Sequence, residues 1–260
     1  PCLQAGAAAC RAGLAALPEA EGTAVLLAGL DGAVQLSVRL ESDPGDRRIE
    51  ALCRGLAAAP VTGGVVTGPR LERAWGEATV PLAQGPWGLL RGAATAFAQA
   101  NADQDEALRR HVVRLAAPAG SLVLELFAGV GNLTVGLCGQ ASSVTAVEAA
   151  GPAASLLRQQ AGAWPGEVRV RAGAAAALVQ ALQREGATAE VVVLDPPREG
   201  APGLLPRLAP LGPRRLVYVA CDPTTLARDL AELTADGRWR VATVVLLDMM
   251  PQTFHVETLV

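Results

Sequence analysis

A series of short, β-branched apolar runs in the second half of the chain constrains the fold more than any other feature. The runs are "SLVLELF", "SVTAVE", "EVRVRA", "EVVVLD", "RLVYVAC" and "RVATVVLLD", and helical patterns separate them. Runs of this kind are typical of a parallel sheet covered by helices on both faces. "HVETLV" adds a last strand at the end of the sequence. Residues 118–260 are therefore predicted to form an α/β domain with a doubly wound, seven-stranded sheet.

Residues 1–92 have a different pattern and are predicted to form a smaller α+β domain. "AVLLAGLDGAVQLSVRL" indicates two strands around Asp31-Gly32, and Val34, Leu36, Val38 and Leu40 alternate as in a half-buried strand. Ile49, Leu52, Cys53 and Leu56 have helical spacing, and a β-like stretch rich in glycine and proline follows. A linking helix is expected within residues 93–117, from about Asn101 to Ala117, ended by Pro118.

Composition excludes several classes of protein. No apolar run reaches the roughly 18 residues of a membrane-spanning helix, and the first 20 residues make a poor signal peptide. The chain does not begin with Met, so we expect a fragment or a processed product. The net charge of −3 argues against a surface that coats nucleic acid broadly, although a local basic face stays open. Five cysteines without a CxxC motif suggest neither a disulfide framework nor a metal site, and a cytoplasmic protein is expected.

In an open parallel sheet, ligands bind beyond the carboxyl ends of the strands. "LELFAGVGNLTVGL" combines a strand, a glycine turn at Gly129 and Gly131, and a helix that begins near Asn132. Glu148 ends the next strand, where a carboxylate can accept hydrogen bonds from both hydroxyls of a ribose. Thr134 stands where a dinucleotide fingerprint needs a third glycine, so S-adenosyl-L-methionine fits better than NAD. The alternative for Glu148 is an exposed strand end without a ligand.

Three ionisable residues follow the later strands. Asp195 begins "DPPR" after an apolar strand, as either a functional carboxylate or a turn-forming residue. Cys221 ends its strand just before a helix for which Thr224 or Thr225 is the expected N-cap, and such a position lowers a thiol's pKa. An inert core thiol is the alternative. Glu257 lies in an apolar strand, where burial raises a carboxyl's pKa as a general base requires. His255 alone is more often structural.

Five motifs together resemble the uracil-5 RNA methyltransferases, which make 5-methyluridine in tRNA and rRNA. The resemblance covers roughly residues 97–260, in the family's order, and its motifs are "FAQAN", "LELFAGVGNLTVGL", "DPPREG", "ACDPTTLARDL" and "DMMPQTFHVETL". It implies a class I methyltransferase sheet and S-adenosyl-L-methionine as cofactor. It further implies Cys221 as the nucleophile and Glu257 as the base. By the same resemblance, the cofactor-site positions are Gln99, Phe127, Asn132, Glu148 and Asp195, beside Gly129 of the glycine turn. Gln99 and Asp195 also touch the target base.

The resemblance implies RNA, either tRNA or rRNA, as the partner, with neither membrane nor metal. Phe97 then stacks on a base, although an apolar contact between domains is equally plausible. Two departures from the family pattern are visible: Asp222 replaces an asparagine after the nucleophile, and "VRVRAGAAAAL" lacks an aspartate after its strand. An added charge at Asp222 would raise the pKa of the thiol. The alternatives are methylation of cytosine C5 in RNA and a non-catalytic RNA-binding relative.

Overall fold

The computed structural model describes residues 2–15, 17, 21–57, 61–253 and 255–260. The chain forms two compact units, one made of residues 1–84 and 89–98, the other of residues 85–88 and 99–260. The boundary therefore falls near residue 98, and the helix that we expected to link two domains belongs to the second unit.

The first unit is a four-stranded sheet with two helices. Strand order is β1-β2-β3-β4, and only the β2–β3 pair is parallel. Alternate residues of β2 are fully buried, as the period-two pattern predicted, and pack against apolar residues of both helices. The elements that begin in this part of the chain are α1 (Cys2–Leu14), β1 (Gly22–Ala28), β2 (Val34–Leu40), α2 (Asp46–Leu56), β3 (Val61–Gly68), β4 (Leu71–Gly76) and the paired strands β5 (Val80–Gly85) and β6 (Gly88–Gly92).

The second unit contains the predicted seven-stranded sheet, in the order β12-β13-β11-β10-β7-β8-β9. Strands β7 to β11 are parallel, whereas β13 runs antiparallel to β11 and to β12. The strands are β7 (Leu122–Leu126), β8 (Ser143–Glu148), β9 (Val168–Ala172), β10 (Val191–Leu194), β11 (Arg215–Ala220), β12 (Val245–Leu247) and β13 (Glu257–Leu259). β12 and β13 are shorter than the sequence predicted, and they pair over only three residues.

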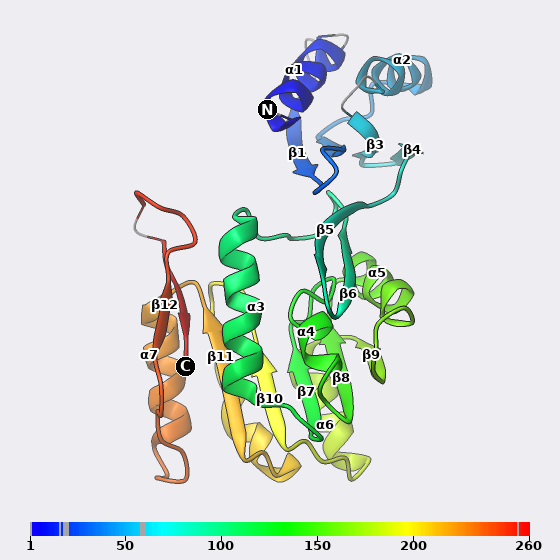
Figure 1. Cartoon of the computed structure of the whole chain (residues 1–260). Helices are drawn as coiled ribbons and strands as arrows, with labels where there is room; N and C mark the ends of the chain where they lie inside the picture. Colours follow the sequence, from blue (N-terminus) through cyan, green and yellow to red (C-terminus); the bar gives the residue numbers. More distant parts are fainter. Residues whose placement is uncertain (1, 16, 18–20, 58–60, 254) are drawn as a thin grey trace. The chain divides into compact units, whose positions relative to one another are not determined.

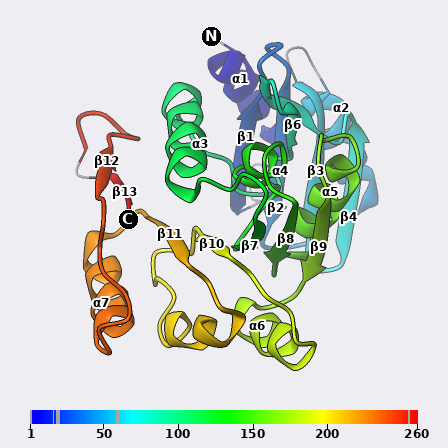
Figure 2. The same cartoon turned by 60° about the horizontal axis from the view of Figure 1, so that its bottom comes forward.

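Helices cover both faces of this sheet (Figures 1 and 2). The helices are α3 (Ala102–Ala116), α4 (Thr134–Cys138), α5 (Gly151–Ala161), α6 (Ala175–Arg184), the 3₁₀ helix η1 (Leu205–Leu211) and α7 (Pro223–Thr234). Helices α3, α4 and α5 lie on one face, and α6, η1 and α7 lie on the other (Figure 2). Helix α3 starts and ends within one residue of its prediction, capped by the Asn101 side chain, which accepts a hydrogen bond from Gln104 N–H.

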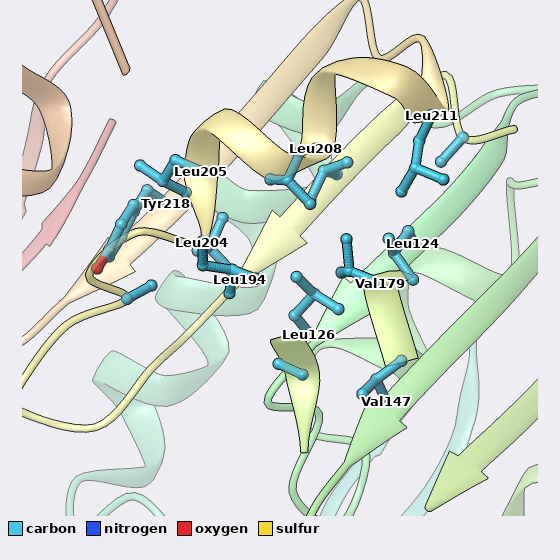
Figure 3. Close-up of a cluster of buried hydrophobic side chains, with 14 of the residues drawn as sticks. Leu124, Leu126, Val147, Val179, Leu194, Leu204, Leu205, Leu208, Leu211 and Tyr218 are labelled. Atoms are coloured by element: carbon cyan, nitrogen blue, oxygen red, sulfur yellow. The ribbon is translucent and has the colours of Figure 1, made fainter. Parts of the chain in front are cut away.

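The core under α6, η1 and α7 shows how the strands are oriented. Leucines of η1 meet Leu124 and Leu126 of β7 and Leu194 of β10 (Figure 3). Side chains alternate between faces along a strand. The residues next to these leucines along each strand therefore face α3 instead. By the same alternation, Asp195 after β10 and Cys221 after β11 also face α3. This alternation decides where the functional candidates point.

Candidate active site

The carboxyl ends of the parallel strands bring most of the predicted site residues to one edge of the sheet. Leu194 of β10 pairs with both Leu126 of β7 and Tyr218 of β11. Phe127 and Asp195 each follow a strand at this edge, and Cys221 follows the end of β11. The edge is thus a row of side chains that the sequence order alone would not place side by side.

Cys221 directly follows β11, and Glu257 begins the neighbouring antiparallel strand β13. Ala220 pairs with Thr258, so the next step of the same register sets Cys221 opposite Glu257. Residues that face each other across antiparallel strands project on the same side of the sheet. Glu257 is only 9% exposed, and its Oε2 has no hydrogen-bond partner among the residues that the structure describes. The carboxyl group therefore lies buried beside the thiol.

Burial raises the pKa of Glu257, as the sequence predicted for a general base. It also raises the pKa of Cys221, and the nearby carboxylates of Glu257 and Asp195 raise it further, while Arg198 lowers it. The expected lowering of the thiol pKa is therefore wrong. Burial and two acidic neighbours outweigh the helix end that follows the cysteine.

Asp195 shares this environment. Burial, together with the charges of the neighbouring Glu257 and Asp105, raises its pKa to about 8. Asp195, Cys221 and Glu257 form a cluster that favours bound protons, which we call the acid–thiol cluster. Two negative charges at short range repel strongly when water is excluded, so the cluster holds fewer charges than it has ionisable groups.

Asp222 is the N-cap of α7, where the sequence predicted Thr224 or Thr225. Its Oδ1 accepts hydrogen bonds from the backbone N–H groups of Thr224 and Thr225, at 2.7 and 3.2 Å. These bonds lower the pKa of Asp222, which holds its charge at the helix end. The charges that raise the thiol pKa are those of Glu257 and Asp195. The aspartate at this position thus performs the capping role that an asparagine side chain also supports.

The glycine turn between β7 and α4 contains three residues with positive φ. Phe127 has φ +62°, a conformation that side chains rarely adopt, and its ring packs on the core under η1. Gly129 has φ +57°, and a Cβ there would meet nothing within 4 Å, so its surface is open. A Cβ on Gly131 would strike Leu157 at 2.5 Å. Gly131 therefore allows close helix packing, and the helix starts at Thr134 rather than near Asn132.

Glu148 ties the glycine turn to the end of β8. Its Oε2 accepts a hydrogen bond from Gly129 N–H at 2.8 Å, and its Oε1 accepts one from Ala150 N–H at 2.7 Å. Each carboxylate oxygen has a second lone pair, so a ribose hydroxyl can still donate to it. The carboxylate is fixed in place before any ligand binds.

Asn132 belongs to a buried network with two residues of α3 that sequence reasoning missed. Arg109 Nη1 donates to Asp105 Oδ2 and, at 2.6 Å, to Asn132 Oδ1. Asn132 Nδ2 donates to Asp105 Oδ1 at 2.6 Å. Arg109 and Asp105 are almost fully buried. Their i, i+4 spacing was the available signal, but most such pairs lie on helix surfaces.

Glu125 of β7 is a second buried carboxyl that the sequence analysis did not single out. It is 1% exposed, and its Oε2 has no hydrogen-bond partner in the described part of the chain. Burial, together with the charges of Asp195 and Glu148, raises its pKa to about 8. A strand residue on the α3 face, beside the glycine turn, therefore stays protonated near neutral pH.

The remaining predicted residues, Gln99 and Phe97, lie before α3. Gln99 precedes α3 in the second unit and is half-buried, and Asn101 Nδ2 donates to Met249 O at 3.3 Å, which ties the start of α3 to the turn after β12. Phe97 belongs to the first unit and is 77% exposed, so its contact with a base stays a prediction. Phe254 of the "PQTFHVE" motif lies outside the described residues.

Among the described residues, no helix is long and apolar enough to span a membrane. Within the same residues, no group of three histidine, cysteine, aspartate or glutamate side chains is arranged to hold a metal ion.

Comparisons with known proteins agree with the fold and the motifs. The family model described as tRNA (uracil-5-)-methyltransferase matches residues 89–260. The chain is 37% identical over 227 residues to a 23S rRNA (uracil(1939)-C(5))-methyltransferase, RlmD, of Pseudomonas entomophila, covering 82% of this chain and 47% of the relative. It is 41% identical over 169 residues to the enzyme of that name from Pseudomonas fluorescens, covering 63% of this chain and 36% of the relative.

The structure of Pyrococcus abyssi tRNA (uracil-54, C5)-methyltransferase in complex with S-adenosyl-L-homocysteine superposes with a TM-score of 0.69. It is 24% identical and covers 90% of this chain and 57% of that one. This likeness confirms the predicted fold, which comprises a doubly wound class I methyltransferase sheet and a smaller α+β part. The chain spans less than half the length of the two Pseudomonas relatives.

Proposed function

The chain belongs to the tRNA (uracil-5-)-methyltransferase family, and we propose that it methylates C5 of a uridine in RNA, with S-adenosyl-L-methionine as methyl donor. The observation that carries this proposal is that Cys221 and Glu257 each adjoin the paired residues Ala220 and Thr258 of β11 and β13, near Asp195. The names of the Pseudomonas relatives support ribosomal RNA as the substrate class.

The residues at the glycine turn fit a nucleoside cofactor. Gly129 presents an open surface, and Glu148 is held at the end of β8 with free lone pairs for ribose hydroxyls. We propose that Gln99, Phe127, Asn132 and Asp195 complete this cofactor site. When bound, S-adenosyl-L-methionine supplies an electrophilic methyl group on a sulfonium.

The reaction needs a nucleophile because C5 of uracil does not attack a methyl group unaided. The Cys221 thiolate adds to C6, and the electron pair of the C5–C6 double bond moves towards C5 and the O4 carbonyl. The raised pKa of the thiol makes this step sensitive to neighbouring charges. Arg198 lowers that pKa and favours the thiolate, whereas an ionised Glu257 or Asp195 opposes it.

Glu257 is proposed as the base that completes the reaction. After C5 has accepted the methyl group, it carries both that group and its original proton. Ionised Glu257 removes the proton, the electron pair re-forms the C5–C6 double bond, and the bond from C6 to Cys221 breaks. A buried carboxyl with a raised pKa is a stronger base than an exposed one, which suits this role.

The substrate base has to leave its stack to reach this cluster. A uridine inside a stem cannot approach a thiol at a sheet edge, so the target is flipped out or lies in a loop. We propose that Phe97 stacks on a base of the bound RNA and that Gln99 and Asp195 contact the target uracil.

An RNA that contains 5-fluorouridine tests the function directly. Fluorine at C5 cannot be removed as a proton, so the methylated adduct stays attached to the protein. We expect a cofactor-dependent adduct on Cys221, identified by mass spectrometry of the linked peptide. Cys221→Ala should give no adduct and lower methyl transfer by at least about a thousandfold. It should leave cofactor affinity, measured by calorimetry, within about twofold.

The same experiment separates the alternatives. RNA binding without any adduct between pH 6 and 9 contradicts catalysis and favours a non-catalytic RNA-binding relative. Loss of cofactor binding in Cys221→Ala means that the cysteine is structural. An adduct with 5-fluorocytidine RNA but none with 5-fluorouridine RNA favours cytosine, an alternative for which the matched family gives no support.

A further inference from the structure

Asp229 of α7 is a fully buried carboxylate that the proposed reaction does not use. It is 0% exposed, and its Oδ2 accepts hydrogen bonds from Tyr218 Oη and from Ala201 N–H, both at 2.7 Å. Arg228 donates to its Oδ1 through Nε and Nη2, at 2.9 and 2.7 Å. Although burial opposes ionisation, these donors hold the pKa of Asp229 below its ordinary value. The carboxylate is therefore charged and saturated with donors.

Two hydrogen bonds made by Asp229 and Arg228 fix the far end of the loop that follows β10. Ala201 N–H binds Asp229, and Arg228 Nη2 also donates to Glu199 O at 2.7 Å. Tyr218 supports Asp229 from β11, where its ring lies beside Leu204 and Leu205 (Figure 3). We call Tyr218, Arg228 and Asp229 the loop clamp. The clamp joins β11, α7 and the loop, which are separate in sequence.

The glycine between the two fixed residues shows how closely the loop approaches the clamp. Gly200 has φ +74°, and a Cβ there would lie 2.5 Å from Asp229 Oδ2 and 2.8 Å from Arg228 Nη2. Any larger residue would push the loop away from the carboxylate. The glycine of "REG" is thus favoured both by its positive φ and by its close approach to α7.

The loop held in this way carries Asp195 and Arg198, and the helix that holds it begins next to Cys221. Asp222 caps α7 directly after the cysteine, and Arg228 and Asp229 lie two turns further along. The clamp therefore joins the segment that bears the thiol to the segment that bears Arg198 and Asp195. Arg198 favours the thiolate of Cys221, and Asp195 opposes it.

We propose that Asp229 is a positioning residue that, with Tyr218 and Arg228, holds the loop of residues 195–201 so that Arg198 faces Cys221. The inference rests on the proposed function only in taking Cys221 as the reacting group. Without the clamp, Arg198, which is exposed, would move into solvent, while Asp195, which directly follows β10 and is partly buried, would stay at the end of that strand. The thiol would then lose its favourable neighbour and keep its unfavourable ones.

The direction of the effect separates positioning from a direct charge effect. Asp229→Asn removes a negative charge, so direct electrostatics alone would make the thiolate of Cys221 easier to form. Loss of the clamp has the opposite effect, because Arg198 moves away. A rise in the pKa of the Cys221 thiol in Asp229→Asn thus identifies the positioning role. General loosening of the fold predicts a fall in that pKa instead, because greater exposure to water favours the thiolate.

The test is the rate of alkylation of Cys221 by iodoacetamide from pH 6 to 10, followed by peptide mass spectrometry in the full chain without RNA or cofactor. We expect Asp229→Asn to lower the rate at neutral pH about three- to tenfold, equivalent to a rise of half to one unit in the thiol pKa. Asp236→Asn, on the exposed turn after α7 and paired with Arg238, is the matched control and should follow the wild type.

Tyr218→Phe provides a second variant that removes one hydrogen bond to Asp229 and no charge. It should shift the profile in the same direction by less, and it keeps the test decisive if Asp229→Asn does not fold. A profile that is unchanged or shifted to lower pH in a folded clamp variant overturns the inference. The alkylation assay contains no RNA, so its outcome does not depend on the 5-fluorouridine experiment. A wild-type chain that forms no 5-fluorouridine adduct would contradict the proposed function without deciding whether Asp229 positions the loop.

Discussion

The two halves of the sheet edge differ in how their polar side chains are hydrogen-bonded. On the side of β7 and β8, Glu148 accepts hydrogen bonds from backbone N–H groups, and Asn132 is hydrogen-bonded to Asp105 and Arg109 of α3. On the side of β10, β11 and β13, burial raises the pKa of Asp195, Cys221 and Glu257, and Glu257 Oε2 has no partner within the described residues. One half is fixed by protein contacts, whereas the other keeps reactive groups available.

This difference follows from what each half is proposed to do. A binding surface gains when its groups are held in place before the ligand arrives, because less conformational entropy is lost on binding. A nucleophile and a base need groups whose protonation changes during the reaction, and saturated hydrogen bonds would prevent that. Substitutions on the side of β10, β11 and β13 should therefore lower the reaction rate. Substitutions on the side of β7 and β8 should lower stability and cofactor affinity.

The largest effect is expected in the acid–thiol cluster, from Glu257→Gln. An amide cannot remove the C5 proton, so turnover should fall roughly 10²- to 10⁴-fold. Addition and methyl transfer should continue, so a covalent complex with ordinary uridine RNA should accumulate. Denaturing gel electrophoresis with radiolabelled methyl donor measures that complex.

Glu167→Gln, a surface change just before β9 where the carboxylate pairs with Arg169, is the matched control and should turn over normally. A Glu257→Gln variant that retains wild-type turnover would remove Glu257 from the role of base. Loss of cofactor affinity without accumulation of the complex would place Glu257 in the binding half instead.

The next effect belongs to the fixed half. Arg109→Met leaves Asp105 buried with a single side-chain partner, Asn132, and removing one partner of a buried ion pair costs about 3–5 kcal/mol of unfolding free energy. Urea denaturation followed by circular dichroism measures this loss. Cofactor affinity should also fall, because Asn132 loses its donor beside the glycine turn.

Arg110→Met is the neighbouring control. Arg110 is exposed and pairs with Glu106 at 3.5 Å, so its removal should cost less than about 1 kcal/mol. Equal losses in the two variants would mean that the buried network contributes no more than a surface ion pair.

The smallest effect concerns Glu125 of β7, which belongs to the fixed half but, like the acid–thiol cluster, has a raised pKa. Its folded-state pKa is raised from 4.5 to about 8, so its contribution to stability is full below about pH 4.5 and is lost as the pH rises through about 8. The unfolding free energy of the wild type, relative to Glu125→Gln, should fall by up to about 1.4 kcal/mol per pH unit between pH 5.5 and 7.5. Parallel urea titrations at several pH values measure the difference.

Glu185→Gln gives the opposite case on an exposed surface. The hydrogen bond from Arg171 lowers the pKa of Glu185, so its contribution is lost only as the pH falls below the ordinary glutamate range. Its difference from the wild type should stay constant from pH 5.5 to 7.5. A constant difference for Glu125→Gln as well would show that Glu125 is ionised in the folded protein.

Sequence reasoning worked best where local pattern decides structure. The sheet, helix α3 and the hairpin at Asp31-Gly32 follow from periodicity and turn residues. It was wrong about the pKa of Cys221, because the helix end is local, whereas burial and the charges of Glu257 and Asp195 come from other strands. It missed Arg109, Glu125 and Asp229, since nothing in a short window of sequence tells a buried ionisable residue from an exposed one.

The sequence by itself determined the order of strands and helices, the glycine turn and the family, because hydrophobic period and short motifs are local properties of the chain. Only the tertiary structure decided which carboxyls are buried, which are paired and which lie beside Cys221. Burial and charge interactions depend on distances between segments far apart in sequence, and the packing of α3 and α7 on the two faces of the sheet sets those distances.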